Sequence, residues 1–351
     1  MQTIRVLFLF IVIFLFSAKD FSPVIAATKF KHPPSDRQKI NIDFGWDFFR
    51  GDINGVEETH QVNQRPWQRV NLPHDWTIEG PFDPTHNTTQ GFLPMEIGWY
   101  RYALRFPEHL EDKTIYLLFD GVYRECDVWL NYAHLGHHQS GYTSFAFDIS
   151  DYVRCGDRIP NGLRVRVDGR RHEQDMYEGN GIYRHVWIVV TNKLHVANWG
   201  TFVYASEISD QRAKIHIQTK IVNKYSSKQP FILTTQIVDK NDAIIREVKQ
   251  HHQLAAEDSL VAEQITFIDR PYLWDIDHPH QYRAYSIIEL KNEIVDVYET
   301  KFGIRKTHFD SDNGFYLNDR PLKLVGFNAH YDFAGLGTAI PDRIHFNLIA
   351  I

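Results

Sequence analysis

The sequence predicts a mainly β protein: two β-sandwiches in succession, followed by the first strand of a β/α-barrel. Three observations lead to this prediction. Residues 40–303 contain many short stretches in which apolar and polar residues alternate, with turn signals between them. Glycine and proline recur too often in residues 67–98 to permit a helix there. One nearly continuous apolar stretch, Leu322–Phe327, lies near the C-terminus and is followed by polar, titratable residues.

The first module, residues 40–195, has the strand pattern of a jelly-roll sandwich. Its clearest strand is residues 162–168, in which apolar residues alternate strictly with charged or polar ones. No stretch in this module has the length and periodicity of a helix. Many short strands with turns between them indicate two packed antiparallel sheets. The expected strands are residues 44–49, 99–106, 114–119, 122–130, 144–149, 162–168 and 181–190.

The second module, residues 200–303, has the size of an immunoglobulin-like β-sandwich. Residues from Asn192 to about Ala205 are expected to connect it to the first module. Because this linker is short, we expect the two sandwiches to pack together. The expected strands are residues 213–223, 231–239, 262–268, 283–290 and 294–302, with residues 243–248 as a further candidate.

Residues 308–351 are expected to begin a third module. A turn at Leu317–Pro321 precedes the apolar stretch Leu322–Phe327, which is typical of a strand buried on both faces. Polar residues past the end of such a strand mark the active-site end of a β/α-barrel. Only about thirty residues follow Pro321, whereas a barrel needs roughly 250, so the sequence predicts an incomplete barrel. The alternative is the last strand of a small β domain, with His330 in a solvated tail.

Residues 1–27 read as a secretory signal peptide, so we expect a secreted protein. Arg5 provides the positive end, residues 6–16 are an unbroken apolar stretch, and Val24–Ala27 offers a cleavage site. The apolar stretch is short for a membrane span, and an uncleaved N-terminal anchor is the alternative. After cleavage no membrane partner is expected. Asn87 begins the single glycosylation sequon, in a loop where a glycan would fit.

The composition indicates which classes of partner to expect and whether the cysteines form a disulfide. The formal net charge is −6 and no block of basic residues occurs, so no nucleic-acid partner is expected. Hydrophobic residues make up 43% of the chain, which is ample for folded cores. Aromatic residues make up 14%; they suit strands and can stack on sugar rings. Cys126 and Cys155 are expected to be free thiols, because a domain of this size does not need a disulfide.

Two groups of residues are candidates for chemistry. The loop at residues 171–184 combines carboxylates, an amide, aromatic rings and two glycines that let the backbone approach a ligand. Carboxylates accept hydrogen bonds from hydroxyls, so this loop fits a polyol; a merely solvated loop is the alternative. The second group is Asn328, His330 and Asp332, where the histidine could donate to a hydroxyl or carry a proton.

Several short motifs occur in an order that carries a resemblance to a known family. They extend from about Trp46 to Arg343 and comprise residues 72–76 (LPHDW), 98–101 (GWYR), 128–131 (VWLN), 181–187 (GIYRHVW), 273–274 (LW), 302–305 (FGIR) and 314–330. In this order they resemble glycoside hydrolase family two, the β-galactosidase and β-glucuronidase family. The resemblance implies a galactose-binding-like jelly-roll, an immunoglobulin-like sandwich and a catalytic TIM barrel.

The resemblance implies a retaining glycosidase, in which one glutamate protonates the leaving oxygen and another attacks the anomeric carbon. Both glutamates lie late in the family's barrel, so this chain is expected to contain no catalytic residue. By matching positions, Asp175 resembles an aspartate that meets the sugar's hydroxymethyl group, with a sodium ion in some members. His330 resembles a substrate-contacting histidine, and Asn328 lies beside it. Sodium or magnesium is the cofactor that the resemblance implies for the full-length enzyme.

The sequence departs from the family pattern at the end of the chain. Ala329 stands where many members have a larger residue, and Tyr331 where several have histidine. Residues 344–351 are apolar and lack a helix cap where the family continues into a barrel helix. We therefore expect a truncation or a misread gene end.

The function expected from these observations is hydrolysis of O-glycosyl bonds by an enzyme of β-galactosidase type. This chain would be its N-terminal portion, inactive alone, with a β-galactoside or related carbohydrate as ligand. The alternative is a non-catalytic carbohydrate-binding or interaction protein. A third hypothesis is a fragment that complements a separate barrel chain, and a homo-oligomer also fits.

Overall fold

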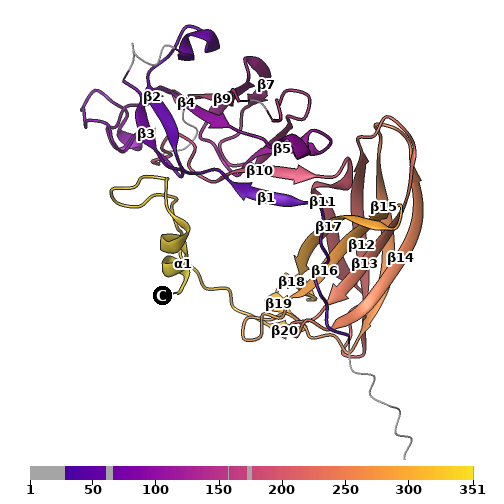
Figure 1. The fold of residues 1–351 in the computed structure, drawn as a ribbon. Helices are drawn as coiled ribbons and strands as arrows, with labels where there is room; N and C mark the ends of the chain where they lie inside the picture. Colours follow the sequence, from indigo (N-terminus) through magenta and orange to yellow (C-terminus); the bar gives the residue numbers. More distant parts are fainter. Residues whose placement is uncertain (1–27, 61–65, 157, 172–175, 351) are drawn as a thin grey trace, which may run out of the picture.

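The computed structural model describes residues 28–60, 66–156, 158–171 and 176–350. It contains two β-sandwiches, and a C-terminal segment that leaves the second sandwich and returns to the first (Figure 1). The predicted signal peptide, residues 1–27, lies outside the described residues. No helix in the described part of the chain is long and apolar enough to cross a membrane.

The first sandwich is the predicted jelly-roll, and period-two alternation explains its strands. In β9 (Asn161–Asp168), Leu163, Val165 and Val167 are fully buried while Arg166 and Asp168 are half-buried. The six-stranded sheet has the order β3-β2-β4-β9-β6-β7, and the four-stranded sheet the order β1-β10-β5-β8. The strands are β1 (Gln38–Asn41), β2 (Trp46–Arg50), β3 (Gln68–Val70), β4 (Ile97–Leu104), β5 (Thr114–Phe119), β6 (Glu125–Leu130), β7 (Ala133–His138), β8 (Phe145–Asp148), β9 and β10 (Val186–Thr191).

One aromatic-rich core lies between these two sheets. Trp46 and Tyr100 from the larger sheet and Phe119 from the smaller one belong to the same buried cluster. Cys126 is also fully buried there, and both cysteines are free thiols, as predicted. Short 3-10 turns occupy three of the loops: η1 (Val56–His60), η2 (Thr88–Gln90) and η3 (Glu108–Leu110).

The second sandwich is immunoglobulin-like, with sheets β11-β12-β15 and β14-β13-β16-β17. The expected linker at residues 192–205 is wrong, because Leu194–Ser206 is strand β11, which pairs along β12. Its apolar residues do not form one buried face: Trp199, Phe202 and Tyr204 are exposed, and only Leu194, His195 and Val196 are buried. The other strands are β12 (Arg212–Asn223), β13 (Gln229–Val238), β14 (Ile244–Leu254), β15 (Ser259–Asp269), β16 (Tyr282–Leu290) and β17 (Glu293–Phe302).

The residues just after position 27 tie the two sandwiches together. Phe30 stacks on Tyr285 of the second sandwich, with ring centroids 3.9 Å apart. Arg37 then pairs with the buried carboxylate of Asp296, with Nε to Oδ1 at 2.7 Å. The chain continues into β1, which pairs with β10 of the first sandwich. These contacts explain why the polar residues before β2 have a defined structure.

His195 lies where the two sandwiches meet, and it is buried in its neutral form. Its Nδ1 is 2.8 Å from the carbonyl oxygen of Asn192, which can only accept, so Nδ1 carries the proton. Its Nε2, 2.9 Å from the hydroxyl of Tyr116, then accepts from that hydroxyl. Burial is the main cause that lowers the pKa of His195 to about 4.

The C-terminal segment begins with a small sheet of β18 (Thr307–Asp310), β19 (Gly314–Leu317) and β20 (Arg320–Pro321). The predicted strand Leu322–Phe327 is not formed: residues 322–330 have no regular secondary structure. Leu324, Val325 and Phe327 are exposed, because no neighbouring strand in the described chain supplies ladder hydrogen bonds or covers them. The segment then packs on the jelly-roll and ends in α1 (Asp342–Ala350). A helix thus forms where the sequence suggested only an uncapped apolar tail.

We predict that stability falls in mild acid because of His195. Its pKa is lowered in the folded state, so between pH 6.5 and 4 the unfolded chain binds a proton that the folded chain does not. The contribution is present above pH 6.5 and is lost as pH falls, by roughly 3 kcal/mol at pH 4. Urea unfolding at several pH values measures it. His195→Gln should flatten this dependence, whereas Gln at the exposed His109 should not; equal slopes would contradict the assignment.

Candidate functional site

One cavity brings together the two regions that the sequence marked as candidates. Its volume is about 300 Å³, and we call it the tyrosine cavity. One wall comes from the jelly-roll, including the loop at residues 176–183, and the other from the C-terminal segment. The lining residues are Tyr123, Tyr142, Met176, Tyr177, Glu178, Tyr183, Asn328, Ala329, His330, Tyr331 and Thr338.

Three tyrosines give the jelly-roll wall its shape. Tyr123 and Tyr142 meet edge to face, with ring centroids 5.5 Å apart. Tyr183 donates its hydroxyl hydrogen to the carbonyl oxygen of Gly141 at 2.8 Å, which fixes that ring. Gly141 is required because an added Cβ would collide with the Tyr123 ring. Backbone and rings are therefore packed closely enough to fix the wall.

The hydroxyl of Tyr123 is buried and forms no well-aligned hydrogen bond within the described residues, with the carboxylate of Glu178 and the hydroxyl of Tyr142 as its polar neighbours. Burial, together with the nearby carboxylate of Glu178, raises the pKa of Tyr123 well above its ordinary value. Burial and Glu178 likewise raise the pKa of Tyr142 to about 12. Both phenols are therefore protonated at neutral pH and can donate hydrogen bonds. An orphaned buried hydroxyl in a cavity is a natural partner for a ligand's polar group.

Glu178 supplies the acceptor of the cavity. Its side chain is almost fully buried, and Oε1 lies 3.3 Å from the hydroxyl of Tyr142, which donates to it. The side chain of Gln90 holds this part of the loop through two hydrogen bonds. It accepts from the backbone N–H of Glu178 at 3.0 Å and donates to the carbonyl of Met176 at 2.6 Å. The loop is thus held from the interior of the domain.

The carboxylate of Asp75 joins the loop to the C-terminal segment. It is 3% exposed and accepts five hydrogen bonds. Oδ1 accepts from the backbone N–H groups of Thr77 and Asn180, both at 3.0 Å. Oδ2 accepts from the hydroxyl of Tyr177 at 2.7 Å, and from the N–H and the hydroxyl of Thr338 at 2.9 and 3.1 Å. Residues from both cavity walls therefore donate hydrogen bonds to the same buried carboxylate, that of Asp75.

Two glycines allow these segments to approach Asp75. Gly179 and Gly337 have φ values of +66° and +60°, in the left-handed region that side chains disfavour. A Cβ at either position would also collide with Oδ2 of Asp75. These positions therefore require glycine both for conformation and for space.

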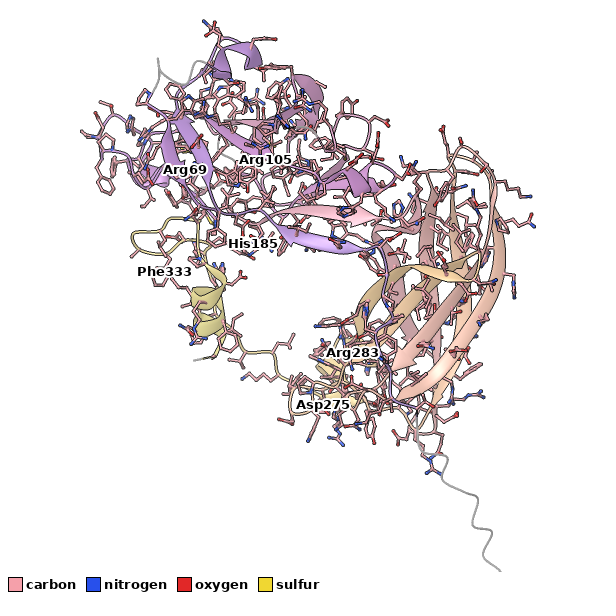
Figure 2. The ribbon with its side chains drawn as sticks, in the orientation of Figure 1. Arg69, Arg105, His185, Asp275, Arg283 and Phe333 are labelled. Atoms are coloured by element: carbon pink, nitrogen blue, oxygen red, sulfur yellow. The ribbon has the colours of Figure 1, made fainter. Side chains whose placement is uncertain are left out.

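A second contact anchors the start of α1 on the jelly-roll. His185 lies between two carboxylates, with Nδ1 2.6 Å from Asp43 Oδ2 and Nε2 3.1 Å from Asp342 Oδ1. Burial alone would lower the pKa of His185, but the two carboxylates outweigh it and raise that pKa. Figure 2 shows His185 on the side of the jelly-roll that faces the returning segment, with Phe333 in the turn above α1.

The structure bears differently on each predicted site residue. Asn328 and His330 both line the tyrosine cavity, where they lie exposed on the C-terminal wall. Asp175, predicted to bind substrate and sodium, lies outside the described residues. Asn87 is exposed, and its Oδ1 accepts from the N–H and hydroxyl of Thr89 at 2.9 and 2.8 Å. The described chain has no cluster of three or more His, Cys, Asp or Glu side chains that could hold a metal.

Sequence reasoning missed the two residues that organise the cavity, Tyr123 and Asp75. Tyr123 sits at the start of a predicted strand, so its ring reads as core. Asp75 belongs to a motif that carried the resemblance, Leu72–Trp76, but no role was assigned to it. An acidic residue between histidine and tryptophan in a proline-rich loop was the available signal.

We predict that Gly337→Ala loosens the C-terminal wall. The new Cβ would be strained at its positive φ and would displace Asp75, at a combined cost of about 2 kcal/mol. Limited proteolysis should then cut residues 333–350 faster than in the wild type. Gly335→Ala is the matched control: its φ is +78°, but nothing lies within 4 Å of the added Cβ. Equal cutting in both variants would mean that the contact with Asp75 does not hold the wall.

Family models match both sandwiches of the chain. The model described as "Glycosyl hydrolases family 2, sugar binding domain" matches residues 56–192, which hold most of the jelly-roll. The model described as "Glycosyl hydrolases family 2" matches residues 194–305, the second sandwich. The second match begins at the first residue of β11, in agreement with the strand seen there.

Relatives and solved structures agree with these matches. The chain is 33% identical over 314 residues to the beta-galactosidase BoGH2A of Bacteroides ovatus, covering 88% of this chain and 36% of that protein. It is 29% identical over 334 residues to a beta-glucuronidase of Formosa agariphila, covering 88% and 34%. A solved glycosyl hydrolase family 2 member from Bacteroides cellulosilyticus superposes with a TM-score of 0.81 at 33% identity, covering 89% and 41%.

The chain thus spans little more than a third of the length of the curated relatives it matches. The matched part is their N-terminal portion, which comprises a jelly-roll and an immunoglobulin-like sandwich. From the family models, the relatives and the fold together, we conclude that this chain belongs to glycosyl hydrolase family 2.

Proposed function

We propose that this chain is the sugar-binding, non-catalytic portion of a β-galactosidase-type glycosidase that hydrolyses β-galactosides with retention. The observation that carries the proposal is the tyrosine cavity, in which the jelly-roll loop and the residues after the apolar stretch face one ligand volume. A volume of about 300 Å³ lies at the small end of ligand pockets, which suits a sugar ring.

The chemistry of the cavity complements a neutral sugar. Protonated hydroxyls of Tyr123 and Tyr142 can donate to ring or hydroxyl oxygens, while the carboxylate of Glu178 can accept from sugar hydroxyls. The tyrosine rings offer apolar faces for the C–H groups of the sugar. His330 and Asn328 would complete the hydrogen bonding from the C-terminal wall.

The cavity binds in this proposal but does not hydrolyse. A retaining glycosidase needs two carboxyl groups about 5–5.5 Å apart, one as acid and one as nucleophile. Glu178 is the only carboxylate among the described residues that line the tyrosine cavity. The acid and the nucleophile would come from the catalytic barrel that the family resemblance implies.

Preference for galactosides and secretion are further parts of the proposal. Galactoside preference is supported by Gln174-Asp175-Met176, through the resemblance, and by relatives named beta-galactosidase. Other relatives are named beta-glucuronidase, so a glucuronide is the competing substrate. Secretion is supported by the signal-like residues 1–27 and by the exposed sequon at Asn87.

A second candidate function is carbohydrate binding without any catalytic partner. It is favoured by one observation: residues of this chain alone provide both walls of the tyrosine cavity. Turnover after a separately expressed barrel chain of the family is added would speak for the glycosidase portion. Unchanged binding and no turnover in that mixture would favour the binding protein.

We predict that methyl β-galactoside binds the chain and that Tyr123→Phe weakens binding about three- to tenfold. Phe removes one neutral hydrogen bond to the ligand, worth roughly 0.5–1.5 kcal/mol. Isothermal titration calorimetry measures the change. Tyr152→Phe, at a partly exposed tyrosine of the same domain outside the cavity, is the control. Absence of galactoside binding would sink the proposal.

We also predict that the purified chain does not cleave p-nitrophenyl β-galactoside. The described residues that line the cavity offer one carboxylate, which cannot act as both acid and nucleophile across the glycosidic bond. A colorimetric assay at high protein concentration, with an intact family 2 glycosidase as positive control, makes the measurement. Turnover that survives repurification would show that the chain carries its own catalytic pair.

A further inference from the structure

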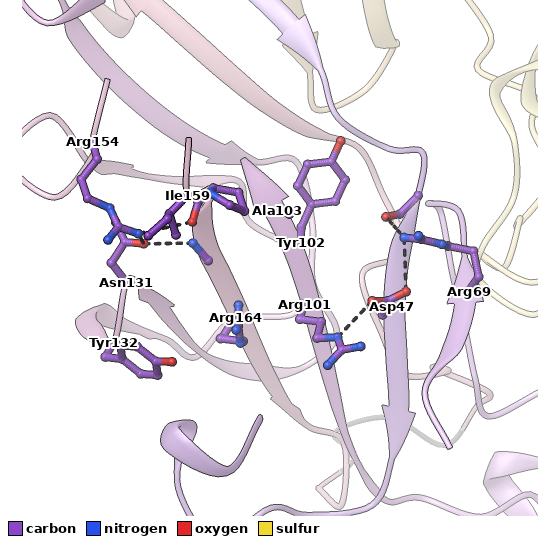
Figure 3. A pocket seen from close by; sticks show the side chains of 13 residues that line it. Asp47, Arg69, Arg101, Tyr102, Ala103, Asn131, Tyr132, Arg154, Ile159 and Arg164 are labelled. Atoms are coloured by element: carbon purple, nitrogen blue, oxygen red, sulfur yellow. Dashed lines mark hydrogen bonds and ion pairs between the residues drawn. The ribbon is translucent and has the colours of Figure 1, made fainter. Parts of the chain in front are cut away.

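A larger cavity lies elsewhere on the jelly-roll, at the end of the six-stranded sheet where β2 and β9 begin. Its volume is about 620 Å³, and we call it the arginine cavity (Figure 3). None of its lining residues lines the tyrosine cavity. Its lining comprises Gly45, Asp47, Arg69, Arg101, Tyr102, Ala103, Asn131, Tyr132, Arg154, Ile159, Pro160, Gly162 and Arg164.

The charge of this cavity is strongly unbalanced for a protein whose net charge is negative. Among the described lining residues, four arginines face a single carboxylate, that of Asp47. Asp47 is already shared: Arg101 Nε lies 3.0 Å from Oδ2 and Arg69 Nη1 lies 3.2 Å from Oδ1. Asp47 therefore has little capacity left to neutralise Arg164.

Arg164 is the buried member of the set. It is 9% exposed, and its hydrogen-bond partners among the described residues are neutral: Nε donates to the Thr59 hydroxyl at 2.8 Å and Nη1 to the Leu163 carbonyl at 3.0 Å. Among the described residues no carboxylate lies within 4 Å of it. Burial and the neighbouring charge of Arg101 lower the pKa of Arg164 to about 10, so it is still a cation at neutral pH. A buried cation without a counter-ion is costly unless an anion binds beside it.

The geometry also limits the kind of anion. A guanidinium group has five N–H donors, and only two of those of Arg164 are used within the described chain. Planar guanidinium forks pair best with carboxylates and similar oxyanions. The volume far exceeds a lone oxyanion and falls in the range of small-molecule sites. Tyr132 and Ile159 expose apolar surface at the rim, which suits the C–H faces of a ring.

We propose that the arginine cavity is a second ligand site, which binds a carboxylate-bearing saccharide through the guanidinium groups of Arg69, Arg101 and Arg164. The sugar ring lies against Tyr132 and Ile159, and the carboxylate supplies the counter-charge that no described residue gives to Arg164. This site differs from the tyrosine cavity in position and in charge preference. It would hold an acidic polysaccharide chain near the domain without taking part in cleavage.

Titration calorimetry on the full chain with a trimer of α-1,4-linked galacturonate tests the proposal. The methyl-esterified trimer, which has the same shape without charge, should bind at least tenfold more weakly. Arg69→Gln should weaken trimer binding about tenfold, because it removes a charge-assisted hydrogen bond. Arg170→Gln is the matched control, since Arg170 is an exposed arginine paired with Asp168 outside the cavity. Equal binding of both trimers, or no effect of Arg69→Gln, overturns the proposal.

Three further experiments distinguish this ligand site from a structural arginine, from an adventitious ion and from the galactoside site. Arg164→Met should abolish trimer binding while the thermal midpoint stays equal or rises, because a buried uncompensated charge is removed. A fall of the midpoint by more than a few degrees would show that Arg164 is structural instead. If sodium acetate at the same concentration displaces the trimer, the cavity holds an adventitious ion only. Tyr123→Phe should leave trimer affinity unchanged, so failure of this proposal is distinguishable from failure of the galactoside site.

Discussion

The carboxylate of Asp75 is the interaction on which the candidate site depends. It is buried, and its hydrogen-bond partners are all neutral: three backbone N–H groups and two hydroxyls. No lysine or arginine within the described chain lies close enough to pair with it. A charge in such surroundings is tolerated only when its lone pairs are satisfied, so the donors and the carboxylate fix one another. The loop at residues 176–181 and the segment around Thr338 are held by the same group.

The two walls of the tyrosine cavity therefore differ in how extensively they are packed. On the jelly-roll side the rings and Glu178 are embedded in a domain with a large aromatic core. On the C-terminal side, Gly337–Ile340 is buried, but residues 322–332 are almost wholly exposed. His330 and Asn328 therefore reach the cavity from a stretch that is anchored by Asp75 after it and by the small β18-β19-β20 sheet before it.

Much of the fold could be predicted from the sequence, because apolar and polar residues alternate with a period of two in most of the strands. Residues 114–119 and 162–168 were predicted almost to the residue, since their apolar faces pack into one core. β11 was missed because much of its length faces solvent, so its alternation is weak. Composition alone predicts a strand at 322–327, but composition cannot supply a pairing partner. The short strands β1, β3 and β7 carry too little apolar pattern to be recognised.

The candidate site was predictable in its parts but not in its assembly. Their chemistry marks the loop at 171–184 and the residues at 328–332 as candidates, and the structure places members of both on one cavity. What joins them is a long-range contact, from Asp75 to Thr338, and no local pattern encodes a partner 263 residues away. The arginine cavity is similar: its arginines come from β3, β4, β9 and a loop, so their clustering appears only once the sheet is formed.

Amide hydrogen exchange tests the central claim most directly, by comparing wild type with Asp75→Asn. Asparagine keeps one acceptor oxygen and turns an amide donor toward donors, so it cannot satisfy the five groups that meet the carboxylate. The account predicts that the amides of Asn180 and Thr338 both lose protection, at least tenfold, while core amides such as that of Val165 keep theirs. Unchanged protection at Thr338 would contradict it, because the two walls would then be joined by something other than Asp75.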